Sequence, residues 1–453
     1  MRLEVIVLAA GQGTRMKSRT PKVLHTVGGK PMLTRVLETV NALTPARAHV
    51  VVGENGDDFQ SVFDEFDVNW VRQSEQLGTG HAVLQALPDL DAEAQALVVY
   101  GDCPLVKPST VKRCVAAGQD GVGLITAVVP DPFGLGRIVR NTAGQVESIV
   151  EQADIAPEQC DIDEINSGIL STSVGVLREQ LPRLIANNAQ GEIYLTDLIA
   201  EAVSDGVAIN AVKALDYREV LGVNDRVQLA KVERIFQRWQ AEDLMKRGVS
   251  IADPSRFDCR GTVTTGLDCS MDINVLLEGD VELGDNVQIG SNCILRNVQI
   301  ASNTIVKENT VIEDATVGRD CSIGPFARIR PGTTLDDNVG IGNFVEIKNS
   351  QLASGVKAAH LAYLGDAEIG ADTNIGAGAI TCNYDGRNKH RTIIGDNVFI
   401  GSNSSLIAPL TIEAGAAVAA GSSISRNVST DELVIERADQ RTVKGGGTRF
   451  RRR

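Results

Sequence analysis

A glycine-rich stretch near the N-terminus has the composition of a phosphate-binding loop. The apolar run Val5–Leu8 is followed by Ala9 to Met16, which reads AAGQGTRM. This order predicts a buried parallel strand that leads into a Gly-rich loop. Glycine lets backbone N–H groups approach a phosphate closely, and Arg15 and Lys22 add positive charge. Because no Gly-Lys-Ser/Thr follows and position 16 is not glycine, the loop is neither a Walker A motif nor a dinucleotide fingerprint.

An acidic residue follows a later strand of the same region. Apolar runs at His49–Val52, Ala96–Tyr100 and Leu124–Val129 alternate with helical stretches, which predicts an open, mostly parallel α/β sheet of Rossmann-like type. In such sheets ligands bind beyond the carboxyl ends of the strands, where Asp102 lies. Its carboxylate could bind Mg²⁺ or could cap a turn, and the residues alone favour neither. Loops at the same predicted edge carry Gln73, Gly78, Thr79 and Gly136.

The second half of the chain repeats an aliphatic residue every six positions. The members are Leu283, Ile289, Leu295, Ile300, Val306, Ile312, Val317, Ile323, Ile329, Leu335, Ile341 and Ile347, then Ile394, Ile400, Leu406, Ile412, Val418 and Ile424, with a five-residue step at two places. A period of six fits neither a helix nor strand alternation, and it predicts a hexapeptide β-helix. An ordinary sheet of alternating strands would not keep this phase.

The register of six breaks twice, between Ile347 and Ile369 and between Ile375 and Ile394. We expect loops at both breaks, because insertions in repeat proteins form loops that often carry the function. The first break contains His360, which could act as a base or could simply bond to the backbone. The second contains Asn383 and Tyr384.

Length and composition limit the class of protein. The chain has 453 residues, which indicates two or three domains, and a net charge of −14, which disfavours nucleic-acid binding. It has no apolar run long enough for membrane insertion and no signal-peptide pattern. Its eight cysteines are scattered, which favours reduced thiols and a cytoplasmic location. The basic tail from Arg449 onward (Arg451, Arg452 and Arg453) is typical of a solvated terminus.

A long amphipathic stretch separates the two halves. Asn224 and Asp225 precede it and Arg247-Gly248 ends it, which predicts a linker helix. We therefore predict an α/β domain at 1–226, a linker helix at 227–247 and a β-helix domain with a basic tail at 248–453.

These motifs together resemble a family of bifunctional N-acetylglucosamine-1-phosphate uridylyltransferases and glucosamine-1-phosphate acetyltransferases of bacterial cell-envelope synthesis. Leu8–Met16 with Pro21-Lys22 is similar to the sugar-phosphate nucleotidyltransferases. His360–Asp366 (HLAYLGD) and Ile380–Gly386 (ITCNYDG) are more specific to the left-handed β-helix acyltransferases of this family. The left-handed coil is what the resemblance implies, since crossovers are usually right-handed.

The resemblance implies two sites. The nucleotide-sugar site would use Leu8, Ala9, Ala10, Gly11, Lys22, Gln73, Gly78, Thr79, Tyr100, Gly101, Asp102, Gly136, Glu151, Asn166 and Asn224. Within it Arg15 and Lys22 would hold the triphosphate of UTP, and Asp102 and Asn224 would hold Mg²⁺.

In the β-helix, the resemblance implies an acetyl-transfer site with His360 as general base. Arg330 and Lys348 would bind the sugar phosphate, and Tyr363 and Asn374 the sugar. Acetyl-CoA would contact Ala377, Asn383, Tyr384, Ser402, Ala420 and Arg437. We also expect Glu346, two residues before Lys348, to orient the His360 ring. Family members are homotrimers with this site between neighbouring β-helices.

Two alternatives remain beside the bifunctional enzyme. One is a nucleotidyltransferase whose β-helix only oligomerises or regulates, and the other is a silent regulatory subunit with both folds. Arg15, Lys22 and Asp102 argue against the silent subunit. His360 with Arg330 and Lys348 argues against a purely regulatory β-helix.

Overall fold

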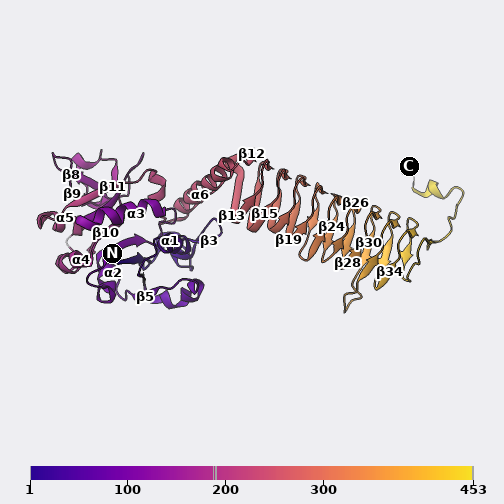
Figure 1. The fold of residues 1–453 in the computed structure, drawn as a ribbon, viewed down its shortest axis with the longest axis horizontal. Coiled ribbons are helices and arrows are strands. Elements are labelled where there is room, and N and C mark those ends of the chain that lie inside the picture. The colour runs from indigo at the N-terminus through magenta and orange to yellow at the C-terminus, as the bar shows by residue number, and fades with distance from the viewer. Residues whose placement is uncertain (1, 187, 189–190, 451–453) are drawn as a thin grey trace. The chain divides into compact units, whose positions relative to one another are not determined.

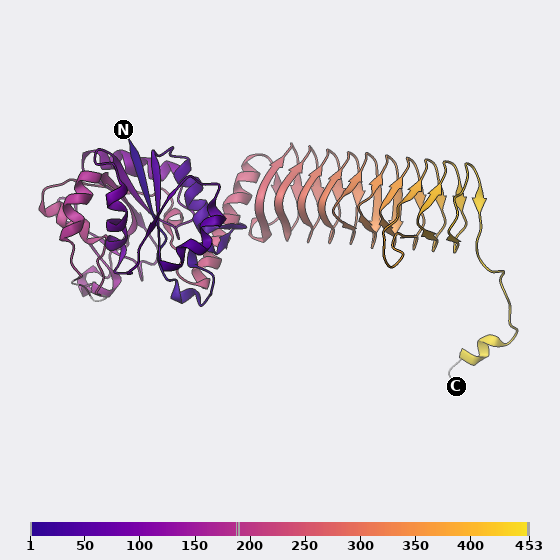
Figure 2. The same ribbon diagram turned by 90° about the horizontal axis from the view of Figure 1, so that it is seen from below.

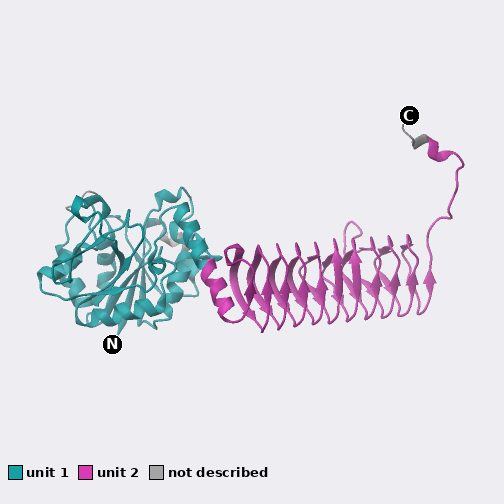
Figure 3. Ribbon diagram, turned by 90° about the horizontal axis from the view of Figure 1, so that it is seen from above, with its two compact units in different colours: residues 1–236 teal, residues 237–453 magenta. Residues whose placement is uncertain are grey.

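The chain forms two compact units, Met1–Phe236 and Gln237–Arg453 (Figure 3). The structure is a computed structural model that describes residues 2–186, 188 and 191–450, so the basic end of the tail from Arg451 lies outside the described residues. The helix α6 (Arg226–Lys246) overlaps the stretch where we predict a linker helix, and the unit boundary falls within it. In the part of the chain that is described, no helix combines the length and apolar character needed to cross a bilayer.

The first unit is built on a nine-stranded sheet whose main order is β11-β7-β10-β6-β1-β4-β5 (Figure 1). Its strands are β1 (Leu3–Leu8), β4 (Arg47–Val52), β5 (Asn69–Arg72), β6 (Gln95–Tyr100), β7 (Val122–Val128), β8 (Arg137–Arg140), β9 (Val146–Val150), β10 (Glu164–Ser173) and β11 (Ile209–Lys213). Strand β1 is parallel to both β4 and β6, whereas β10 runs antiparallel to β6 and β7. The predicted α/β class is confirmed.

Both faces of this sheet are covered, which explains its continuous apolar strands. The helices are α1 (Met32–Asn41), α2 (Thr79–Ala86), α3 (Pro108–Ala117), α4 (Val174–Gln180) and α5 (Asp197–Ser204), and a small hairpin joins β2 (Thr26–Val27) to β3 (Lys30–Pro31). Alternate residues of β1 belong to different cores, with Val5 and Val7 in one and Ile6 and Leu8 in the other. Side chains alternate across a strand, so a strand buried on both faces has no polar side.

The second unit is a parallel β-helix, as the six-residue period predicts, and it is left-handed, as the resemblance implies (Figures 1 and 2). One sheet contains β12 (Ser250–Ile251), β14 (Ser270–Met271), β16 (Gln288–Ile289), β18 (Ile305–Val306), β20 (Ser322–Ile323), β23 (Gly340–Asn343), β26 (Lys357–His360), β29 (Asn374–Ile375), β32 (Phe399–Ile400), β35 (Ala417–Val418) and β37 (Leu433–Val434). Every pairing along it is parallel, because each strand pairs with its counterpart in the next coil.

A second, fifteen-stranded sheet forms the rest of the wall. It contains β13 (Phe257–Thr265), β15 (Val275–Leu283), β17 (Ile294–Ile300), β19 (Val311–Val317), β21 (Arg328–Ile329), β22 (Thr333–Leu335), β24 (Glu346–Lys348), β25 (Gln351–Leu352), β27 (Tyr363–Gly365), β28 (Ala367–Ile369), β30 (Ile380–Cys382), β31 (Thr392–Ile394), β33 (Ser405–Ile407), β34 (Leu410–Ile412) and β36 (Ser423–Ile424). Asn and Asp occupy many corners at positive φ, a conformation these residues tolerate because their short polar side chains bond locally.

The first register break is not a loop, which corrects our expectation. The coil continues through it with Leu352, Ala358 and Leu364 buried in the core positions. Ala358 pairs with Ile341 and Ile375, and Leu364 pairs with Ile347, as in the coils on either side. The pattern is hidden in the sequence because five-residue steps replace six and because alanine fills one core position.

The second register break is a loop, as predicted. Strands β30 and β31 are joined by a segment, residues 383–391, that leaves the wall (Figure 2). Across it, equivalent residues of successive coils are 25 positions apart, compared with 17 at His360. A short antiparallel bridge between Tyr384 and Lys389 closes the segment on itself.

Candidate functional site

A cleft of about 490 Å³ lies at the carboxyl ends of β1 and β6 in the first unit. Twelve of the residues predicted for the nucleotide site line it: Leu8, Ala9, Ala10, Gly11, Arg15, Lys22, Gln73, Gly78, Thr79, Tyr100, Asp102 and Asn224. Carboxyl ends of parallel strands are where open α/β sheets bind ligands, so the geometry agrees with the sequence argument.

Two glycines in the cleft are required by their surroundings. Gly13 has φ 62°, and a Cβ on it would lie 2.7 Å from the Cβ of Lys22. Gly78 has φ 113°, and a Cβ there would lie 2.5 Å from the carbonyl oxygen of Ile193. Only glycine combines this backbone with such close contacts. The two positions therefore let the loop pack on Lys22 and let α2 begin beside the cleft.

Lys22, Asp102 and Asn224 meet on one side of the cleft. The Lys22 ammonium forms an ion pair with Oδ2 of Asp102 and donates to Oδ1 of Asn224 at 3.2 Å. The backbone supports this arrangement, since N–H of Val223 donates to the carbonyl oxygen of Asp102 at 3.0 Å. Two oxygens thus converge on one cationic group, here an ammonium. Mg²⁺ in nucleotide enzymes is bound through one or two carboxylates plus substrate phosphates, so these residues fit that ion.

Gly136, Glu151 and Asn166 form a second group next to the cleft. A Cβ on Gly136 would lie 3.2 Å from the Glu151 carboxylate, and the Gly136 carbonyl accepts from N–H of Asn166 at 2.9 Å. Burial raises the pKa of Glu151. Burial also raises the pKa of Tyr100, and the charge of Glu151 adds to this. Tyr100 lines the cleft, and a Cβ on Gly168, two residues after Asn166, would lie 2.5 Å from its ring, so the group adjoins the cleft there.

Gly101 does not line the cleft. Its N–H donates to the carbonyl oxygen of Leu8 at 2.9 Å, so it packs behind the loop and continues the pairing of β1 with β6. A side chain there would approach Leu8 and Leu33, each within 3.3 Å of a Cβ. Its placement favours a structural role that keeps Asp102 next to the loop.

Several cleft residues were missed by the sequence analysis. They are Val23, Gln76, Ala82 and Glu192, whereas Gln12, Gly13 and Thr14 belong to the predicted Gly-rich loop. Gln76 donates from Nε2 to the carbonyl oxygen of Ala10 at 2.6 Å and so braces the Gly-rich loop. Its position two residues before Gly78, a predicted site residue, was the signal in the sequence that could have identified it. Glu192 carries no such signal, because it reaches the cleft from a segment more than a hundred residues away.

In the β-helix, His360 ends β26 at a corner of the coil. Its Nδ1 is 2.7 Å from Oδ1 of Asn343, which ends the neighbouring strand β23. Our prediction that Glu346 orients the ring is wrong, because Glu346 instead accepts from Arg330 at 2.6 Å. The corner at Phe344, with φ 58°, separates the strand of Asn343 from the strand of Glu346. Glu346 and Lys348 lie on the same strand, β24, whereas His360 lies on β26, so a position near Lys348 in the sequence did not place Glu346 against the histidine ring.

A column of charged side chains leads to the predicted phosphate-binding residues. Successive coils of the fifteen-stranded sheet place Arg260, Glu278, Arg296, Glu313, Arg330 and Lys348 at equivalent positions. The first four alternate in sign and form ion pairs along the column. The alternation ends at Arg330 and Lys348, where one cation follows another. An anion bound there would restore the charge balance.

Lys389 adds a third cation to this end of the column. It lies close enough to Lys348 to lower the pKa of that lysine, and the charge of Arg330 lowers it further. Lys389 comes from the 383–391 loop, which Asp385 organises by accepting from the N–H groups of Arg387 at 2.7 Å and Asn388 at 2.6 Å. The Asn388 N–H is the main cause of an Asp385 pKa of about 2. Sequence reasoning missed Lys389, because only the loop brings it here.

Tyr363 and Asn383 approach the same place. Both surround Gly365, since a Cβ on that glycine would lie 2.4 Å from the Tyr363 hydroxyl and 2.7 Å from Nδ2 of Asn383. Gly365 pairs in register with Lys348, so these side chains adjoin the cationic end of the column. Asn383 is buried and donates to Asp366 at 2.5 Å.

The other residues predicted for acetyl-CoA lie in line with His360. Ala377, Ser402 and Ala420 follow it at the same position in successive coils, and a guanidinium nitrogen of Arg437 donates to the carbonyl oxygen of Ala420 at 2.5 Å. Asn374 is on the same sheet, paired with Lys357. Tyr384 is exposed, and its hydroxyl donates within its own loop to Gly386 at 2.7 Å. The structure thus separates the row that continues from His360 from the cations of Arg330 and Lys348 around the corner.

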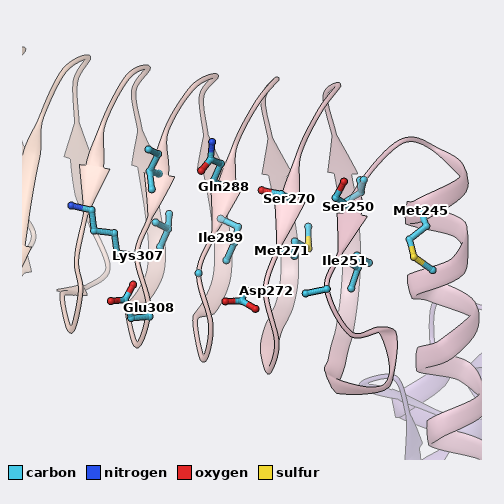
Figure 4. Close-up of a pocket in the computed structure, with 15 residues that line it drawn as sticks. Met245, Ser250, Ile251, Ser270, Met271, Asp272, Gln288, Ile289, Lys307 and Glu308 are labelled. Carbon is cyan, nitrogen blue, oxygen red and sulfur yellow. The ribbon is translucent and has the colours of Figure 1, made fainter.

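A larger hollow, of about 660 Å³, follows the first coils of the eleven-stranded sheet (Figure 4). Ser250, Ser270 and Gln288 from successive strands lie along it, with Asp272 and Glu308 near its corner. It contains none of the predicted site residues. Its size alone therefore does not make it a candidate site.

Comparison with known proteins gives three family matches. Residues 5–152 match the MobA-like NTP transferase domain, residues 259–336 the GMPPB C-terminal domain, and residues 391–426 the hexapeptide repeat of succinyl-transferase. A nucleotidyl transferase structure from Methanothermobacter thermautotroptrophicus matches at 20% identity and a TM-score of 0.39, and the match covers 52% of this chain and 99% of that one.

Curated relatives match nearly the whole chain. The bifunctional protein GlmU of Alkalilimnicola ehrlichii is 50% identical over 443 residues, which are 98% of this chain and 96% of the relative. GlmU of Acinetobacter baumannii strain ACICU is 52% identical over 97% of both chains, and GlmU of Marinobacter nauticus is 50% identical over 98% of both. Identity at this level along both units, with a site in each, means that the chain belongs to the family of bifunctional GlmU proteins.

Proposed function

We propose that this enzyme makes UDP-N-acetylglucosamine in two steps. The β-helix transfers the acetyl group of acetyl-CoA to glucosamine-1-phosphate, and the cleft then joins the product to UTP and releases pyrophosphate. The observation that carries the proposal is the presence of two equipped sites in one chain, one around Lys22 and Asp102 and one around His360 and Lys348. Full-length relationship to the GlmU proteins supports both activities.

In the cleft, the difficulty of the reaction is charge repulsion. A phosphate oxygen of the sugar attacks the α-phosphorus of UTP, so two anions must approach each other. Arg15 and Lys22 would offset that charge on the triphosphate, with the Gly-rich loop donating backbone N–H groups. We propose that Asp102 and Asn224 hold Mg²⁺, which when bound neutralises charge developing on the phosphate oxygens. Lys22 would then turn from Asp102 to the phosphates.

In the β-helix, the nucleophile is the 2-amine of the sugar. We propose that Arg330, Lys348 and Lys389 bind its phosphate, since they form a cationic end to an otherwise balanced column. Tyr363 and Asn374 would contact the sugar, and Ala377, Asn383, Tyr384, Ser402, Ala420 and Arg437 would contact acetyl-CoA. His360 would take the proton that the amine loses on acylation, because the lone pair of a neutral imidazole can act as a general base.

One incubation series tests the two activities together. The chain is mixed with glucosamine-1-phosphate, acetyl-CoA, UTP and Mg²⁺, and the products are identified by mass spectrometry. We expect UDP-N-acetylglucosamine and pyrophosphate. Leaving out acetyl-CoA should stop the product unless N-acetylglucosamine-1-phosphate replaces the amino sugar. A nucleotidyltransferase with a merely regulatory β-helix would respond only to the acetylated sugar, and a silent subunit would give no product in any mixture.

We also propose that the chain assembles as a homotrimer through the β-helix. Phe326, Phe344 and Leu361 occupy one corner of successive coils at positive φ and are 49%, 55% and 61% exposed. The two phenylalanine rings stack with centroids 5.3 Å apart. Bulky residues rarely adopt this backbone, and Asn309 occupies the same corner one coil earlier. An exposed apolar corner beside His360 fits contact with a second copy, and cyclic symmetry closes such a set.

Light scattering on the purified chain at micromolar concentration should therefore give three times the 48.2 kDa chain mass. Phe344→Asn keeps a residue suited to the backbone and removes the apolar ring, so we expect a smaller trimer fraction together with weaker acetyl transfer. Leu267→Ser, which removes another exposed apolar side chain of the same unit, is the matched control. A monomer with full acetyltransferase activity would contradict a site shared between chains.

A cytoplasmic location completes the proposal. All eight cysteines are free thiols in the structure, and most of them are buried. Unpaired thiols persist in a reducing compartment, whereas secreted proteins tend to pair them.

A further inference from the structure

The hydrogen bond to the His360 ring comes from the coil next to it. Asn343 and His360 end the parallel strands β23 and β26 and are partners in the register. Asn343 makes two hydrogen-bonding contacts, one with the histidine ring and one with the residue after it. Its side-chain oxygen Oδ1 is 2.7 Å from Nδ1 of His360, and its backbone oxygen accepts from N–H of Leu361 at 3.0 Å. One residue thus fixes both the ring and the backbone that follows it.

The chemistry of the amide oxygen decides which ring nitrogen carries the proton. An amide oxygen only accepts hydrogen bonds, so Nδ1 of His360 must be the protonated nitrogen of a neutral ring. The lone pair is then on Nε2, for which the described residues provide no hydrogen-bond partner. A base needs a free lone pair, and this contact leaves one at a defined atom.

The ring has little charge around it. The strands that pair with β26 are β23 (Gly340–Asn343) and β29 (Asn374–Ile375), and neither contains a titratable residue. On its own strand the charged residue is Lys357, which begins β26. Glu346 around the corner is paired with Arg330. A carboxylate against Nδ1 would stabilise the imidazolium form and raise the histidine pKa, whereas an amide orients the ring without that effect.

We propose that Asn343 is a positioning residue for acetyl transfer, which holds the His360 ring in the tautomer with Nε2 free. This inference rests on the proposed role of His360 as the base. In that step the amine adds to the thioester carbonyl, so that a C–N bond forms and the C–S bond breaks. Nε2 takes the proton from the amine nitrogen and passes it to the departing CoA thiolate.

The test uses the full chain and two substitutions. Asn343→Asp is nearly the same shape and adds a charge, so the acid limb of kcat/KM for acetyl transfer should move up by about one pH unit, as expected for a histidine gaining a carboxylate neighbour. Asn343→Ala should leave that limb in place and lower kcat roughly 2- to 10-fold, the loss expected for one hydrogen bond. KM for glucosamine-1-phosphate should stay within about twofold. Gln288→Ala, an exposed side chain on the same sheet, is the control.

The outcomes separate this inference from the function on which it rests. Wild-type kcat and pH profile in both Asn343 variants, with His360→Ala inactive, would overturn the positioning role alone. Full acetyl transfer by His360→Ala would overturn the base, and the positioning role with it. If Asn343→Ala does not fold, which circular dichroism shows, the pH profile of Asn343→Asp decides. Uridylyl transfer measured in the same samples reports on the integrity of the chain.

Discussion

Asp102→Ala should reduce uridylyl transfer to background while acetyl transfer stays at the wild-type level. The substitution removes the carboxylate that pairs with Lys22 and that, with Asn224, would hold Mg²⁺. Without it, the charge that develops as two phosphates approach loses its main compensation. The acetyl-transfer site uses residues of the other unit, so it should not respond.

The measurement is the rate of pyrophosphate release over a series of Mg²⁺ concentrations. Asp102→Asn, which keeps the shape and removes the charge, should need more Mg²⁺ than wild type. Asp120→Ala, an exposed carboxylate of the same unit, controls for general effects of losing a charge. A Mg²⁺-dependent rate in Asp102→Ala equal to that of wild type would rule out the metal-ligand role. A melting curve shows whether leaving Lys22 without its partner destabilises the unit.

His360→Ala should lower acetyl transfer roughly 10²- to 10⁴-fold, the usual loss when a general base is removed. The sugar amine must lose a proton as it is acylated, and His360 is the one histidine within the described strands of the β-helix, since His390 lies in the 383–391 loop next to Asp385. Uridylyl transfer should be unchanged. Since the ring is exposed and Asn343 is its hydrogen-bond partner among the described residues, its removal should cost little stability.

The rate of CoA release near pH 7.5 measures this effect, with Lys357→Ala on the same strand as control. Acetyl transfer within a factor of a few of wild type would remove His360 from the mechanism. Loss of both activities would instead indicate misfolding.

Two parts of the cleft differ in how far the sequence alone predicts them. The Gly-rich loop can be predicted from the sequence, because its function requires residues that are neighbours in the chain: a strand, glycines and then Arg15. The convergence of Lys22 with Asp102 and Asn224 is not readable from spacing, since these partners are 80 and 202 positions away from the lysine. From the sequence, only the family resemblance assigned Asp102 and Asn224 to Mg²⁺ and Lys22 to the triphosphate. In the structure, their convergence comes from the order of the parallel strands, which brings the ends of β1 and β6 together.

In the β-helix, the core residues that recur every six positions were enough to predict the coiled architecture, because no helix or flat sheet has that period. The contacts within the site could not be predicted in this way. A corner at Phe344 turns Glu346 away and leaves Asn343 as the partner of His360. A loop carries Lys389 to Lys348, and five-residue steps keep the first register break within the wall. Periodicity reports which residues face the core, whereas contacts between outward side chains depend on corners and loops, which have no period.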